Sequence, residues 1–111
     1  MKIKIKDYEY EILEVDKDGV ELKGQSLGLT KYEDNKIFLD KDMEYNRKRS
    51  VLKHELFHAF IDAYGHYFDN GLVFTCEHVC EIGATFSEDI LEIVNKYFSK
   101  VSDNNGKWKK S

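Results

Sequence analysis

Two histidines four residues apart, His54 and His58, are the residues of this chain best suited to metal chemistry. Together with Glu55 they form a His-Glu-x-x-His motif over residues 54–58. In a helix, side chains four apart lie one turn above each other, so both imidazoles can bind one ion. Glu55 lies about 100° around that helix from His54, within reach of a water on the ion. The motif therefore predicts two zinc ligands and a general base, Glu55.

A third ligand is needed, because a catalytic zinc ion usually has three protein ligands and one water. The metzincin pattern places a glycine three residues and a histidine six residues after the second motif histidine. Ile61 and Tyr64 occupy those positions after His58, so this pattern is excluded.

A glutamate from a following helix is the other arrangement, and two glutamates one turn apart are available. Glu77 comes 19 positions after His58, which is enough chain to leave the first helix and return. We expect Glu77 to be the third ligand, with Glu81 as the alternative. If Glu77 is the ligand, Glu81 can accept a hydrogen bond from a ligand histidine. His66 and His78 are the remaining alternatives for the third position.

Other polar residues near the motif are candidates for supporting roles. Asp62, one turn beyond His58, can orient a ligand imidazole or face water. Tyr64, His66 and His78 are candidates for stabilising a tetrahedral oxyanion. The residue types and spacing do not choose among these three.

Two helices are predicted to carry these residues. The first runs from residue 43 or 44 to about Tyr64 and is followed by Gly65, a common helix stop. The second begins after Thr75 as its N-cap, with His78 at its third position. Apolar residues recur at helical spacing on both: Val51, Leu52, Leu56, Phe60 and Ala63 on the first, and Val79, Ile82, Phe86, Ile90, Ile93, Val94, Tyr97 and Val101 on the second.

The first forty residues predict three or four antiparallel strands. Ile3 and Ile5 alternate with lysines, and Tyr8, Tyr10 and Ile12 then alternate with Glu9 and Glu11, which is typical of a half-buried strand. Residues 16–19 are typical of a turn, after which Val20 and Leu22 continue a hairpin. Residues 27–32 and 36–40 predict a second hairpin. Strands followed by helices indicate one α+β domain over residues 1–101, with a flexible polar tail at 102–111.

Composition excludes several classes of protein. The chain has 111 residues, and its 21 acidic against 17 basic residues give a net charge of −4, which argues against a nucleic-acid partner. No apolar run reaches the roughly 18 residues of a membrane span. Residues 2–6 alternate lysine and isoleucine, unlike a signal peptide, so we expect a cytoplasmic protein with no membrane partner.

The order of these features resembles a known family. A strand-rich N-terminus and Lys36–Asp40 precede Leu52–Phe60, which contains the motif, and a second helix opens with Cys76–Glu81. Over about residues 1–100 this resembles the minimal zincin-like metallopeptidases encoded by phages and mobile elements of Gram-positive bacteria, relatives of the ImmA/IrrE-type gluzincins. The resemblance implies a compact α+β zincin-like fold, one zinc ion per chain, and hydrolysis of a peptide or protein substrate.

By that analogy His54 and His58 are zinc ligands, Glu55 is the general base and Glu77 is the third ligand. The chain departs from the family pattern at one point. Helices of the ImmA/IrrE type tend to carry an alanine–asparagine pair after the ligand glutamate, whereas this chain has Val79-Cys80 and Gly83-Ala84-Thr85. The choice between Glu77 and Glu81 therefore stays open.

A second class of function is a non-catalytic zinc-containing interaction or regulatory module of a phage or mobile element. Glu55 distinguishes the two classes, because a purely structural zinc site has no use for a carboxylate that is not a ligand. The presence of Glu55 therefore favours the enzyme.

Overall fold

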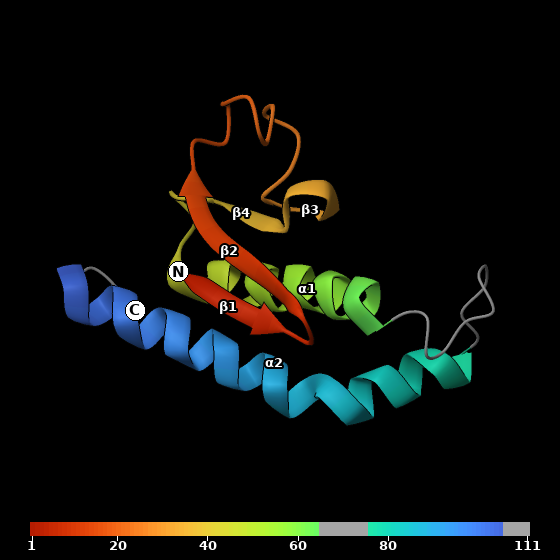
Figure 1. The fold of residues 1–111 in the computed structure, drawn as a ribbon. Coiled ribbons are helices and arrows are strands. Elements are labelled where there is room, and N and C mark those ends of the chain that lie inside the picture. Colours follow the sequence, from red (N-terminus) through yellow and green to blue (C-terminus); the bar gives the residue numbers. More distant parts are fainter. Residues whose placement is uncertain (65–75, 106–111) are drawn as a thin grey trace.

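The described residues form a four-stranded sheet, two α-helices and one short 3₁₀ helix, an α+β architecture (Figure 1). This computed structural model describes residues 1–64 and 76–105, with side chains described for residues 1–64 and 80–100. The elements in chain order are β1 (Lys2–Ile5), β2 (Tyr8–Val15), β3 (Gly28–Lys31), the 3₁₀ helix η1 (Tyr32–Asp34), β4 (Lys36–Asp40), α1 (Tyr45–Tyr64) and α2 (Cys76–Asn105).

The sheet is mixed, with strand order β1-β2-β4-β3. β1 and β2 form one antiparallel hairpin. β3 and β4 form another, which confirms the hairpin predicted for residues 27–32 and 36–40. The prediction of a wholly antiparallel sheet is wrong, because β2 and β4 pair in parallel. The long connection through β3 returns the chain to β2 in its original direction, which a tight hairpin cannot do.

The segment between β2 and β3 forms turns instead of the predicted strand at Val20 and Leu22. The Gly19 amide donates to the Asp16 carbonyl at 3.0 Å, and the Gly24 amide donates to the Lys17 carbonyl at 2.7 Å. Gly24 has a φ of 68°, a left-handed conformation that glycine adopts readily. In a strand, these amides and carbonyls would pair with a neighbouring strand. Here they pair with each other within the segment, which therefore forms turns.

Both predicted helices are present. α1 begins after Glu44, whose carboxylate accepts hydrogen bonds from the amides of Asn46 and Arg47 at 3.2 and 2.7 Å and so caps the helix. The predicted stop Gly65 and cap Thr75 lie outside the described residues. α2 extends to Asn105, so residues 102–105 of the predicted tail are helical. Neither helix is long and apolar enough, within the described chain, to cross a bilayer.

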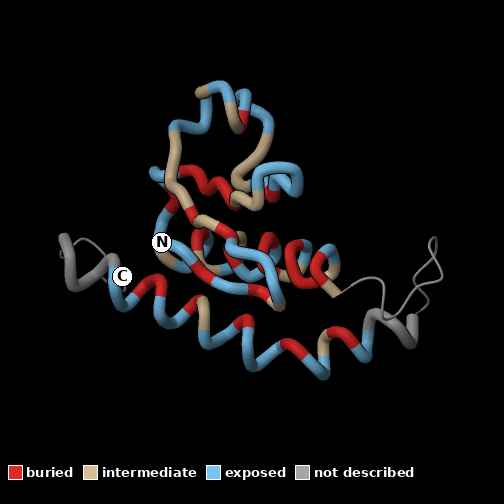
Figure 2. Tube along the Cα trace, in the orientation of Figure 1, coloured by how far each residue is buried: buried red, intermediate tan, exposed pale blue. Residues whose placement is uncertain are grey.

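The core lies between the sheet and the helices. α1 packs against one face of the sheet, and α2 runs along the lower side of the molecule and extends beyond α1 at both ends (Figure 1). Buried positions recur about once per turn along α2 (Figure 2). Each such apolar side chain contributes about 1.5–3 kcal/mol when fully buried. Among the described side chains, the buried hydrophobic residues of α1 are Leu52, Leu56, Ala59, Phe60 and Ala63, and those of α2 are Ile82, Phe86, Ile90, Val94, Tyr97 and Phe98.

A buried polar network joins both helices to β2. The fully buried Lys48 ammonium donates to Oε1 of Glu14 at 2.7 Å and to the Lys41 carbonyl at 2.9 Å. The Tyr97 hydroxyl donates to the other carboxylate oxygen, Oε2. Burial, and then this contact with Glu14, raises the pKa of Tyr97 above its ordinary value. The network and the apolar stripe together fix the rotation of α1 about its axis, and hence the directions in which the residues of the motif point.

Candidate metal centre

His54 and His58 lie on the solvent-exposed side of α1. Their Nε2 atoms are 3.1 Å apart and their ring centroids are 4.8 Å apart. Two imidazole nitrogens bound to one tetrahedral zinc ion, each at about 2.0–2.1 Å, would be roughly 3.3 Å apart. The separation of the two Nε2 atoms is therefore close to the one that two ligands of a single ion would have.

A shallow apolar groove adjoins this pair. A cavity of about 340 Å³ is lined by Lys53, His54, Phe57, His58 and Ile61. Phe57 and Ile61 are half-buried and pack against the core. The two imidazoles thus lie beside apolar side chains at the surface of α1.

Glu55 points from the same helix toward β3 and is buried, with 7% of its surface exposed. The Thr30 hydroxyl lies 2.7 Å from Oε1 of Glu55 and 3.0 Å from its backbone carbonyl oxygen. Gly28 provides the room for this packing. A Cβ atom at Gly28 would lie 2.6 Å from Cγ1 of Val51 and 3.1 Å from Cγ of Glu55. The general base predicted from the motif is therefore held between α1 and β3.

Further along α1, Asp62 accepts a hydrogen bond from the hydroxyl of Tyr10 at 3.1 Å. Its partner in the structure is thus a buried tyrosine of β2, and its predicted role in orienting a ligand imidazole stays a prediction. Tyr32 of η1 is 43% exposed. Burial, followed by the charges of Asp62 and Glu55, raises the pKa of Tyr32 above its usual range.

The predicted third ligands lie on α2. Glu81 is exposed, and residues 1–64 and 80–100 contain no group of three or more His, Cys, Asp or Glu side chains that could hold a metal ion. Glu77 and His78 lie in the first turn of α2, where side chains are outside the described residues, and His66 lies outside them altogether. The described side chains therefore bring together two candidate ligands, His54 and His58, and the complete set of ligands stays a prediction.

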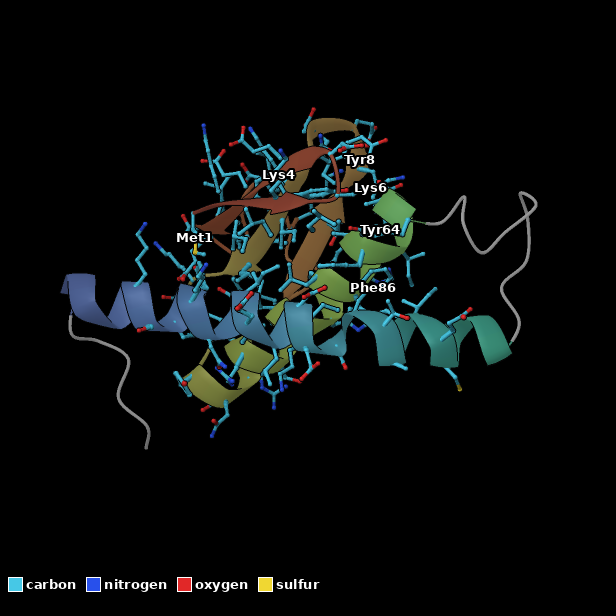
Figure 3. The ribbon with its side chains drawn as sticks, turned by 60° about the horizontal axis from the view of Figure 1, so that its bottom comes forward. Met1, Lys4, Lys6, Tyr8, Tyr64 and Phe86 are labelled. Carbon is cyan, nitrogen blue, oxygen red and sulfur yellow. The ribbon has the colours of Figure 1, made fainter. Side chains whose placement is uncertain are left out.

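Tyr64, one of the oxyanion candidates, belongs to an aromatic cluster. Its ring stacks on Phe86 of α2 with centroids 4.5 Å apart, and the Lys6 ammonium lies 5.6 Å from its centroid (Figure 3). Six residues after His58, Tyr64 is about 240° further around α1. Its ring therefore packs on a different side of the helix from the two histidines.

Two residues of β3 that the motif does not include pack against Glu55: Gly28 and Thr30. They are two positions apart in the strand, so they share one face of it. A threonine on the inward face of a predicted strand was the signal that could have singled out Thr30. The strand's alternation alone does not say which helical residue it meets.

Comparison with known proteins adds no further identification. The chain matches no protein-family model, no curated protein and no solved structure. Its function is therefore inferred from the arrangement of its own residues, above all His54, Glu55 and His58.

Proposed function

We propose that this protein is a zinc-dependent metallopeptidase with a zincin-like fold. The observation that carries the proposal is the combination of two ligand nitrogens 3.1 Å apart with a buried carboxylate in the same helical turn. His54 and His58 would hold the zinc ion, and Glu77 would complete the site, with Glu81 as the alternative. A bound zinc ion would supply a Lewis acid and lower the pKa of a water molecule.

Glu55 is the general base of this proposal. Its carboxylate would take a proton from the attacking water and later deliver that proton to the nitrogen of the departing amine. Burial against β3 restricts the carboxylate to a small range of positions, which favours proton transfer over a fixed path. A non-catalytic zinc module would have no comparable need for a buried carboxylate beside its ligands.

In the part of the chain that the structure describes, β3 is the last strand of the sheet, and this unpaired edge supports a peptide substrate. The Asp40 amide donates to the Leu27 carbonyl at 2.9 Å, and hydrogen-bonded pairs alternate along an antiparallel ladder. The backbone groups of Gly28 and Thr30 therefore point away from β4, toward the edge of the sheet. An extended peptide that pairs with them would lie beside Glu55, in the manner of strand addition.

Removal of the metal tests the proposal. Zinc-loaded protein is expected to cleave fluorescently labelled denatured casein, chelation is expected to stop the cleavage, and added zinc is expected to restore it. Zinc at a hundred times its dissociation constant should also stabilise the fold by about 2.7 kcal/mol. Tight zinc binding without any cleavage would favour the non-catalytic module, and cleavage that resists chelation would contradict a metallopeptidase.

The third ligand can be identified by substitution of the two glutamates separately. Glu77→Gln is expected to prevent stoichiometric zinc binding, because it removes a charged ligand. Glu81→Gln is expected to lower zinc affinity by no more than roughly 10- to 100-fold, the effect of losing a hydrogen-bond partner of a ligand. Zinc titration with a competing chromophoric chelator measures both. The opposite order of effects would assign the ligand to Glu81.

A further inference from the structure

The hydroxyl of Thr30 makes two polar contacts with Glu55. The Thr30 hydroxyl lies within hydrogen-bond distance of two oxygens of the same residue, Oε1 at 2.7 Å and the backbone carbonyl oxygen at 3.0 Å. Because the hydroxyl contacts both the main chain and the carboxylate of Glu55, it restricts the side-chain torsions of Glu55 between these two points. Both Thr30 and Glu55 are less than a tenth exposed, so water competes little for this contact.

The two carboxylate oxygens of Glu55 have different surroundings. Oε1 faces the Thr30 hydroxyl, whereas the structure gives Oε2 no hydrogen-bond partner among the described residues. Oε2 lies near Gly28, where a Cβ atom would be only 3.2 Å away. In β3, the Thr30 hydroxyl thus contacts Oε1 of Glu55, and Gly28, which has no side chain, leaves room for Oε2.

We propose that Thr30 is the positioning residue for the general base, holding Oε1 of Glu55 so that Oε2 is the oxygen that accepts the proton. This inference rests on the proposed peptidase function. As the O–H bond of the water breaks, its proton passes to Oε2 and the water oxygen bonds to the carbonyl carbon of the substrate. The proton then passes from Oε2 to the amine nitrogen as the C–N bond breaks.

Thr30 would also link the binding of a peptide substrate to the position of the general base, Glu55. The backbone of Thr30 points to the open edge of β3, where a peptide strand would pair, while its side chain holds Glu55 on α1. A peptide that orders this strand would therefore also order the carboxylate. Losing the hydroxyl should slow turnover and leave substrate binding through the backbone intact.

Thr30→Val and Thr30→Ser form a matched pair for the test. Valine keeps the shape and β-branching of threonine without the hydroxyl, and serine keeps the hydroxyl. Three-bond couplings from NMR report the χ1 and χ2 rotamers of Glu55 in the metal-free protein, with no need for a substrate. We expect one rotamer in the wild type and in Thr30→Ser, and averaged rotamers in Thr30→Val.

Hydrolysis of labelled casein by the zinc-loaded proteins is the second readout. Thr30→Val should lose roughly 10- to 100-fold in kcat with KM unchanged, and Thr30→Ser should recover most of that loss. Averaged rotamers in the wild type, a fixed Glu55 in Thr30→Val, or equal impairment by valine and serine would each overturn the proposal. If the wild type bound no zinc, the proposed function would fail, but the NMR couplings would still decide whether Thr30 holds Glu55.

Discussion

Replacing His54 or His58 with alanine is expected to abolish stoichiometric zinc binding. Each substitution removes one of two nitrogens that lie 3.1 Å apart, and the remaining imidazole cannot chelate the ion by itself. Zinc bound to purified protein should fall from about one ion per chain to background, as measured by elemental analysis after dialysis. Zinc-dependent cleavage should be lost with it.

The fold itself should survive these substitutions, because both histidines are exposed and contribute little to the core. Metal-free His54→Ala and His58→Ala should therefore unfold at nearly the same denaturant concentration as the metal-free wild type. Lys96→Ala, a change at an exposed residue of α2 that does not line the cavity beside the histidines, is the control and should keep its zinc. A full complement of zinc in either histidine variant would show that the ion binds elsewhere.

Glu55→Gln is expected to separate zinc binding from hydrolysis. Glutamine has nearly the shape of glutamate and keeps an oxygen that can accept from Thr30, but its amide cannot take a proton from water. Losing a general base slows a reaction by typically 10²- to 10⁴-fold. The variant should therefore bind zinc as the wild type does and show a loss of this size in kcat on labelled casein.

Glu9→Gln is a suitable control for this experiment, since Glu9 is an exposed carboxylate on β2. It should leave both zinc binding and cleavage unchanged. Loss of zinc from Glu55→Gln would indicate that Glu55 is itself a ligand, and unchanged cleavage would indicate that another group takes the proton. Either result would contradict the role assigned to Glu55.

Local patterns predicted the elements that carry the motif. The spacing of apolar residues predicted α1, including its end at Tyr64. A single buried stripe of apolar side chains specifies both that the segment is helical and which face of the helix is turned toward the core. The β3–β4 hairpin was predicted from two apolar runs around Asn35, which adopts a left-handed conformation with a φ of 53°. In both cases the residues that decide the structure are neighbours in the sequence.

Tertiary features were not predictable in the same way. The parallel pairing of β2 with β4 depends on where the connection through residues 16–35 returns the chain, and no local pattern encodes that. Likewise, the motif identifies Glu55, but only the packing of β3 on α1 shows that Thr30 holds it. The choice between Glu77 and Glu81 is of the same kind, because it depends on how α2 is placed against the two histidines.

The most direct test of the central claim is a crystal structure of the zinc-loaded protein with anomalous data at the zinc absorption edge. The account predicts one strong anomalous peak at about 2.0–2.1 Å from Nε2 of both His54 and His58. It also predicts one carboxylate ligand from α2, a water in the fourth position, and Glu55 beside that water without coordinating the ion. A peak away from the two histidines, or a site closed by four protein ligands, would contradict it.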